Sequence, residues 1–434
     1  MTRILISGGT IVNPGGDYEG PGGLLVEGGV VIDFLKPGEI VEGAVVYDAA
    51  GMVVSPGIID VHTHLREPGY EYKETIATGT RSAAAGGVTT VFCMANTNPV
   101  NDSGEVTKYI LERAREGGVV TVCPVGAVTK GLSGELLTDP EELKGAGVFA
   151  LSDDGNVVSN SGLMRRGMIG AKRFNLPVIT HSEDMTLVDR GVMNEGKVSE
   201  ALGLAGNNAA AEEIMIMRDV TLAKITGARL HVAHVTCAGG VKIIRGAKAR
   251  GINVTAETCP HYFSLTEEAV RELGTNAKVN PPLRTEEDRL KVIEGIVDGT
   301  IDVIASDHAP HAGKDKEVEF PFAMSGMVGL ETLLPLSLRL VHEKRLTLSE
   351  MIKKLTVNPA CALGISGGVL KKGGDADVTV IDPDEEWVVD PEKLFSKSKN
   401  TPFSGWKMRG RVRLTMVKGK TVFKDGKIME GKNV

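Results

Sequence analysis

Eight short apolar segments, most of them followed by polar residues and then by a helical pattern, recur through the middle of this 434-residue chain. They are Ile58–His64, Thr89–Asn96, Val119–Val128, Gly147–Asp154, Pro177–Ser182, Arg229–Val235, Asn253–Tyr262 and Asp302–His311. Continuous apolarity is typical of parallel strands that are buried on both faces. Eight such strands alternating with helices over about 250 residues predict a (β/α)8 barrel of the TIM type.

The two ends of the chain have a different pattern, in which short alternating or apolar runs are separated by glycine turns. The expected strands are Arg3–Ser7, Gly23–Glu27, Val30–Phe34, Ala44–Tyr47, Asp377–Ile381, Val412–Val417 and Lys420–Phe423. Such runs between turn signals predict β-structure rather than βα units. We therefore expect a small discontinuous β-sandwich domain from residues 1–54 and 365–434, and a catalytic barrel domain from residues 55–364.

Composition excludes several classes of protein. Lys and Arg number 49 and Asp and Glu number 56, so the net charge is −7. A nucleic-acid-binding protein normally has a basic excess or a basic stripe, and this sequence has neither. No stretch approaches the roughly 18 apolar residues of a membrane span. The five cysteines are odd in number and have no CxxC spacing, which favours reduced thiols in a cytoplasmic protein.

Potential metal ligands and other polar side chains end six of the eight apolar segments. They are His62 with His64, Asn96, Asp153 with Asp154, His181, His234, and Asp307 with His311. In a βα barrel the carboxyl ends of all strands open at one face, so these side chains are expected to converge there.

The histidines predict a metal centre. His62 and His64 are two residues apart on one strand, so both imidazoles leave the same face. An HxH pair alone is a weak signal, since buried histidines are often only hydrogen-bonded, but His181 and His234 at later strand ends favour metal binding. Four histidines and carboxylates exceed the three ligands of one catalytic zinc. They suit two ions about 3.5–4 Å apart, joined by a carboxylate and a hydroxide.

Next to these residues, Arg66 is the third same-face residue of the first strand, and a guanidinium cannot bind a metal. We interpret it as a receptor for a substrate carboxylate, with an arginine paired to Glu67 as the alternative. Asn96 and Asn280 are further candidates for substrate binding, although asparagine at a strand end is often only a turn former. Asp307 is placed to move a proton between the attacking and leaving groups, and His311 to join Arg66.

Several motifs resemble those of the class I dihydroorotases, a family of cyclic amidohydrolases. Residues 55–69, SPGIIDVHTHLREPG, are similar to the opening strand of the cyclic amidohydrolases. The more specific motifs are MANT at 94–97, SDDG at 152–155, HSED at 181–184, NPPLR at 280–284, DHAPH at 307–311, GLET at 329–332 and KNTPF at 399–403. The similarity runs from about residue 3 to residue 425. One departure is Ala95, where the family usually has proline.

The resemblance implies an activity and a role for each candidate residue. The activity is the reversible cyclisation of N-carbamoyl-L-aspartate to L-dihydroorotate in pyrimidine biosynthesis, with two Zn²⁺ ions. The implied metal ligands are His62 and His64 on the first ion, Asp154 as the bridge, His181 and His234 on the second, and Asp307 on the first, where it is also the acid/base. The implied substrate-binding residues are Arg66, Asn96, Asn280, His311 and the loop at Ser325 and Gly326. Some family members assemble with aspartate transcarbamoylase, so the resemblance admits that partner as well as a homo-oligomer.

Two other interpretations were weighed against this one. The first is another cyclic amidohydrolase, either an allantoinase or a hydantoinase/dihydropyrimidinase. Those relatives typically bridge their metals with a carboxylated lysine at the fourth strand end, where this chain has Asp153 and Asp154 and no lysine. The second is a non-catalytic scaffold homologue, which is expected to have lost ligands, whereas every expected ligand is present here.

Overall fold

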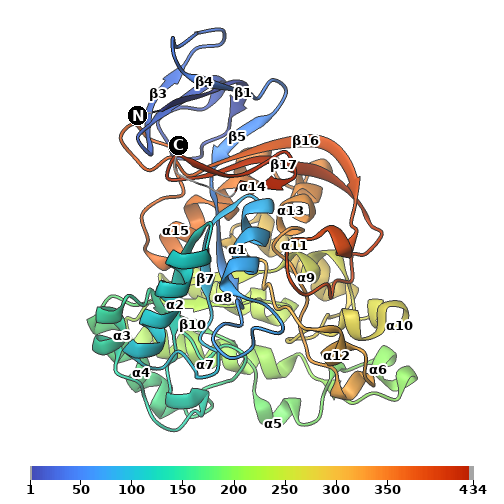
Figure 1. The fold of residues 1–434 in the computed structure, drawn as a ribbon. Coiled ribbons are helices and arrows are strands. Elements are labelled where there is room, and N and C mark those ends of the chain that lie inside the picture. Colours follow the sequence, from blue (N-terminus) through green and yellow to red (C-terminus); the bar gives the residue numbers. More distant parts are fainter. Residues whose placement is uncertain (1, 430–434) are drawn as a thin grey trace.

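The structure, a computed structural model that describes residues 2–429, consists of a barrel and a sheet stacked end to end (Figure 1). The barrel and its helices form the larger part. The sheet, to which both ends of the chain contribute, covers one end of the barrel.

The barrel contains eight parallel strands in the order β15-β14-β13-β10-β9-β8-β7-β6. They are β6 (Ile58–Thr63), β7 (Val88–Cys93), β8 (Thr121–Gly126), β9 (Ala150–Leu151), β10 (Val178–Thr180), β13 (Leu230–Val232), β14 (Val254–Thr258) and β15 (Val303–Ile304). The first and last strands meet where the His64 amide donates to the His308 carbonyl at 2.8 Å. The expected (β/α)8 barrel is therefore confirmed.

Helices surround these strands and connect them. The longer ones are α1 (Ile76–Ala85), α2 (Gly104–Gly117), α3 (Pro140–Ala146), α4 (Ser161–Arg173), α7 (Ala210–Thr226), α8 (Ala238–Ala249), α11 (Glu286–Val297), α13 (Leu333–His342), α14 (Leu348–Leu355) and α15 (Val357–Leu363). Shorter elements near the barrel mouth are α5 (Met185–Val188), β11 (Met193–Asn194), α6 (Lys197–Leu202), β12 (Gly206–Asn207), α9 (Pro260–Ser264), α10 (Ala269–Leu273) and α12 (Gly313–Lys316).

One hydrophobic cluster fills the barrel interior. It combines side chains from seven barrel strands or the residues next to them, among them Ile59, Phe92 and Val303, with Leu363 of α15. Phe92 is fully buried, and its ring meets that of Phe149 edge-on with centroids 6.1 Å apart. The barrel is thus a packed core, as eight-stranded parallel barrels generally are.

The second sheet joins both ends of the chain, as expected. Its strands are β1 (Arg3–Ile11), β2 (Gly20–Glu27), β3 (Val30–Leu35), β4 (Val45–Asp48), β5 (Val53–Pro56), β16 (Val378–Val388), β17 (Lys407–Val417), β18 (Lys420–Lys424) and β19 (Lys427–Ile428). The junction is the antiparallel pair β5–β16, in which Val54 lies opposite Val380. The division into domains at residues 54 and 364 stays a prediction.

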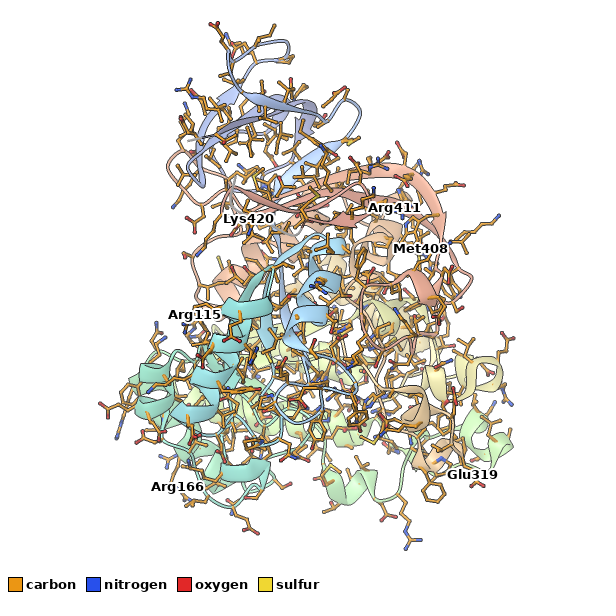
Figure 2. The ribbon with its side chains drawn as sticks, in the orientation of Figure 1. Arg115, Arg166, Glu319, Met408, Arg411 and Lys420 are labelled. Carbon is orange, nitrogen blue, oxygen red and sulfur yellow. The ribbon has the colours of Figure 1, made fainter. Side chains whose placement is uncertain are left out.

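The sheet lies at the end of the barrel where its strands begin. The hydroxyl of Thr379 on β16 donates to the carbonyl of Gly87, directly before β7, at 2.6 Å. Gly87 has φ +80°, and a Cβ there would lie 2.6 Å from Thr379, so this contact requires glycine. Figure 2 shows Lys420 of the sheet in the upper part of the view and Glu319, next to the 320–326 segment, near its lower edge. The mouth of the barrel is therefore free of the terminal strands.

Phe92→Ala is expected to destabilise the barrel by about 3–5 kcal/mol, because it removes a large side chain from a packed interior and leaves a cavity. Thermal unfolding followed by circular dichroism should show a melting temperature several degrees lower. Phe92→Leu is the matched control and should lose less. An unchanged melting temperature for Phe92→Ala would contradict this description of the core.

Candidate metal centre and substrate pocket

All six predicted metal ligands lie together at the mouth of the barrel. They come from five strands, either at the carboxyl end of the strand or in the few residues after it. His62 lies on β6 and His64 directly follows it. The other four are Asp154 after β9, His181 after β10, His234 after β13 and Asp307 after β15. All six side chains are buried.

Asp154 is the centre of this cluster. Its Oδ2 atom lies 3.3 Å from Nε2 of His62 and 3.4 Å from Nε2 of His64. Its Oδ1 atom lies 3.3 Å from Nε2 of His234 and 3.6 Å from Nδ1 of His181. One carboxylate thus turns one oxygen toward each of two pairs of histidines. Asp153, the alternative that spacing left open, instead accepts hydrogen bonds from the backbone of Val128 and Thr129.

Among the six predicted ligands, two groups of ligand atoms are compact enough to hold a cation. One combines His62, His64 and Asp307, and the other combines His62, Asp154 and His234. Within each group the candidate ligand atoms lie within 4.8 Å of one another. The two groups share His62, so two cations held there would be close neighbours.

In three of these histidines, the ring nitrogen that faces away from Asp154 lies within hydrogen-bonding distance of an acceptor. Nδ1 of His62 lies 2.5 Å from Glu257 of β14, and Nε2 of His181 lies 2.7 Å from Glu183. Nδ1 of His64 lies 2.8 Å from Oδ1 of Asn96. A proton held at the remote nitrogen leaves the lone pair of the other nitrogen facing the centre, which is the arrangement of metal-binding histidines.

Sequence reasoning missed Glu257 and Glu183 as functional residues. Burial raises the pKa of Glu257, but the charge of His62 and hydrogen bonds from His231 and His62 outweigh it and lower that pKa to about 2. Both glutamates therefore bring a charge into the protein interior, which is costly unless the charge is paired. The available signals were a glutamate inside an otherwise apolar strand and a glutamate two residues after His181.

The donor set fits a cation. Nε2 of His62 is buried and makes no hydrogen bond, although it lies near both Asp154 and Asp307. Imidazole nitrogen and carboxylate oxygen are the ligands that zinc commonly takes in catalytic sites. An unsatisfied nitrogen among carboxylates is a position that a cation would satisfy.

Three site residues that are not glycine have backbones in the left-handed region. The φ angles are 63° for Arg66, 34° for His234 and 45° for Asp307. Residues other than glycine rarely adopt this conformation, and strain of this kind concentrates at functional sites. Each of the three directly follows or lies close to a barrel strand, where the bend turns its side chain into the mouth.

A cavity of about 440 Å³ opens above the histidine cluster. All six predicted substrate-binding residues line it, namely Arg66, Asn96, Asn280, His311, Ser325 and Gly326. The structure therefore brings together every residue predicted for the site. The role of each residue stays a prediction.

One wall of the cavity is the 320–326 loop, which two buried lysines hold by its backbone. The Lys316 ammonium donates to the carbonyls of Met324 at 2.8 Å and Gly326 at 3.1 Å. The Lys278 ammonium donates to the Phe320 carbonyl at 2.7 Å. This role cannot be predicted from the sequence, because it depends on contacts with main-chain atoms.

Two further histidines close to the cluster contact fixed partners. Nδ1 of His308 accepts from the Gly329 amide, and His231 lies 3.1 Å from Glu257. His261, with Cys259 and Asp307, forms a third group of potential ligands whose atoms lie within 4.8 Å of one another. Burial lowers the pKa of His261 to about 4, which keeps its ring neutral.

Comparison with known proteins places the chain in a family. A family model described as dihydro-orotase-like matches residues 51–239, and a model of the amidohydrolase family matches residues 262–423. A dihydroorotase from Geobacter sp. (strain M21) is 52% identical over 424 residues, covering 98% of this chain and 100% of that protein. A dihydroorotase from Acetivibrio thermocellus is 50% identical over 423 residues, covering 97% of this chain and 99% of that protein. The chain belongs to the dihydroorotase family.

Solved structures of other amidohydrolases share the fold of this dihydroorotase-family chain. The L-hydantoinase from Arthrobacter aurescens superimposes with a TM-score of 0.89 and 27% sequence identity, covering 99% of this chain and 98% of the hydantoinase. The dihydropyrimidinase from Brevibacillus agri superimposes with a TM-score of 0.86 at 23% identity, covering 98% and 96%. Among the residues that the structure describes, no helix has both the length and the apolar character needed to cross a membrane.

Glu257→Gln is expected to weaken zinc binding by about tenfold or more, because the neutral amide orients His62 less firmly than a carboxylate does. Zinc competition with a chromophoric chelator would measure the change. Glu272→Gln, at an exposed position on α10, is the matched control and should bind zinc as the unmodified chain does. Equal affinity in Glu257→Gln would show that Glu257 does not support a metal ligand.

Proposed function

We propose that this chain catalyses the reversible cyclisation of N-carbamoyl-L-aspartate to L-dihydroorotate with two Zn²⁺ ions, as a step of pyrimidine biosynthesis. The observation that carries the proposal is the position of Asp154 between two pairs of histidines, directly below a cavity with a buried arginine. The five unpaired cysteines suit a reducing compartment, so we assign the chain to the cytoplasm.

In this proposal the histidine cluster holds the two ions. His62, His64 and Asp307 would hold the first, His181 and His234 the second, and Asp154 would contact both. Zinc ions bound there would polarise the amide carbonyl of the ring and make water a stronger acid.

The rim of the cavity recognises the carboxylate that remains charged throughout the reaction. The Arg66 guanidinium supplies the positive charge, and His311 lies 3.2 Å from it. Oδ1 of Asn96 is taken by His64, so the amide nitrogen of Asn96 is the atom left to donate to substrate. These groups would hold the substrate so that its uncharged ring amide faces the histidine cluster.

Asp307 moves the proton. Burial raises the pKa of Asp307, but the charge of His62 and a hydrogen bond from His64 outweigh it and hold that pKa below its usual value. The carboxylate is therefore ionised and able to accept a proton. In hydrolysis it would take the proton from the attacking water and pass it to the ring nitrogen as the C–N bond breaks. Cyclisation runs in reverse, and it consumes one proton because two carboxylates become one.

The direct test is to measure zinc per chain together with turnover of dihydroorotate, allantoin and dihydrouracil. We expect two zinc ions and turnover of dihydroorotate. Preference for allantoin or dihydrouracil would replace the proposed substrate with that of another cyclic amidohydrolase. Full zinc loading without any turnover would indicate a scaffold.

Asp307→Asn is expected to lower kcat by about 10²–10⁴-fold, since asparagine keeps an oxygen that can contact a metal but cannot accept the proton. Steady-state hydrolysis of dihydroorotate, with zinc content measured on the same sample, would separate loss of the base from loss of metal. Asp298→Asn, at the exposed end of α11, is the control. Near-normal kcat in zinc-loaded Asp307→Asn would refute the acid/base role.

Arg66→Met is expected to raise KM for dihydroorotate and to lower kcat/KM by about 30-fold or more, the effect of losing about 2 kcal/mol or more from a buried charged contact. Dihydrouracil, which lacks the carboxylate, should be affected far less. Arg115→Met, at an exposed position on α2, is the matched control. Equal losses for both substrates would show that Arg66 does not recognise the carboxylate.

A further inference from the structure

Lys73 lies behind His311, on the side away from the substrate cavity. It precedes α1 and is buried, and its ammonium nitrogen lies 3.2 Å from Nδ1 of His311. The other ring nitrogen, Nε2, faces the cavity. It lies 2.9 Å from the Ser325 carbonyl and 3.2 Å from Nη2 of Arg66.

These contacts select one form of the imidazole ring. An ammonium group has only hydrogens to offer, so Nδ1 of His311 has to be the acceptor. A neutral imidazole carries one proton, which is then on Nε2 and is donated to the Ser325 carbonyl. The opposite tautomer would set an N–H against the Lys73 ammonium and a lone pair against a carbonyl oxygen.

The surroundings of His311 also keep it neutral. The charged groups that face it are Arg66, Lys73, Lys316 and Asp315, whose nearest oxygen is 3.9 Å from Nδ1. Burial and the three cations lower the pKa of His311 to about 2. A doubly protonated ring, which would also donate from Nε2, is thereby ruled out at neutral pH, and the choice between the tautomers decides what this residue offers to a ligand.

With the proton on Nε2, His311 and Arg66 present two N–H donors only 3.2 Å apart. In this structure the Nε2–H donates to the Ser325 carbonyl, so a carboxylate that also accepts from Arg66 would share this hydrogen with the carbonyl or take it over. With the proton on Nδ1, the lone pair of Nε2 would instead face that carboxylate and repel it. The hydrogen position on one ring therefore decides whether His311 adds to the attraction of Arg66 for an anion or opposes it.

Lys73 is itself held in place. Its ammonium lies 3.6 Å from Asp315 and 5.5 Å from the centre of the Tyr72 ring. The hydroxyl of Ser398 donates to its backbone carbonyl at 2.6 Å. The contact with His311 is shorter than the contact with Asp315, so Lys73 is more than one half of an ion pair.

We propose that Lys73 is a positioning residue that fixes His311 as the Nε2–H tautomer, so that this N–H and Arg66 together bind the carboxylate of the substrate. The part of the proposal that concerns the substrate rests on the proposed function. The assignment of the tautomer does not.

The tautomer can be measured on the full-length protein without substrate. In chain labelled with ¹⁵N-histidine, the two ring nitrogens of His311 differ in chemical shift according to which carries the proton, and the spectrum of His311→Gln identifies its signals among the nine histidines. We expect Nε2–H in the unmodified chain and in Lys73→Arg. Lys73→Met should shift the ring at least partly to Nδ1–H. Finding Nδ1–H in the unmodified chain, or an unchanged ring in Lys73→Met, would overturn the proposal.

Kinetics provide a second readout. Lys73→Met should raise KM for dihydroorotate about tenfold with little change in kcat, and Lys73→Arg should restore most of the loss. Lys314→Met is the matched control, because Lys314 lies over the same Tyr72 ring, with its ammonium 4.0 Å from the centre, and is exposed. It removes the same charge nearby and should alter neither KM nor the tautomer.

The two proposals fail in different ways. If the unmodified chain shows the Nε2–H ring but does not turn over dihydroorotate, the proposed substrate is wrong and the role of Lys73 in setting the tautomer stands. If the chain turns over dihydroorotate and Lys73→Met and Lys314→Met raise KM equally, the effect is one of general charge and the positioning role is wrong.

Discussion

The rest of the site depends on how the buried charge of Asp154 is balanced. Moving an ionised carboxylate out of water costs several kcal/mol unless the charge is paired and hydrogen-bonded. Burial raises the pKa of Asp154, but the surrounding histidines have the larger effect and hold that pKa well below its usual value. Asp307, Glu183 and Glu257 bring three more carboxylates close to the same rings. So much negative charge in one buried place favours the binding of cations.

The barrel makes this concentration of charge possible. His62 and Asp307 are far apart in sequence, but Nε2 of His62 lies 3.6 Å from Oδ1 of Asp307, because β6 and β15 meet where the barrel closes. The left-handed backbones at His234 and Asp307 turn these side chains inward at the ends of their strands. Such conformations persist only where the surrounding structure fixes them, and a neighbouring strand on each side provides that support. The terminal sheet lies at the other end, so it leaves the mouth open.

Much of the fold and of the central cluster follows from the sequence, because both depend on patterns along the chain. Apolar runs that end in histidine or aspartate are visible one strand at a time, and the topology of a barrel then brings their ends together. The supporting residues are harder to predict. Glu257 acts through His62 from β14, which is separated from β6 by β15, and Lys316 acts through backbone carbonyls of the 320–326 loop. No spacing in the sequence encodes such contacts. The choice between Asp153 and Asp154 also came from the family resemblance rather than from spacing.

Opposite charges are separated across the site, and this separation determines which ligands suit it. The floor of the cavity is rich in carboxylates, whereas Arg66, Lys73 and Lys316 lie around His311 at the rim. A ligand with a carboxylate at one end and an uncharged amide at the other can satisfy both regions at once. A neutral cyclic ureide would leave the Arg66 guanidinium buried without an anionic partner, which is costly in a site of low dielectric. The charges of the rim and the floor therefore match a ring that carries a carboxylate better than a neutral ring.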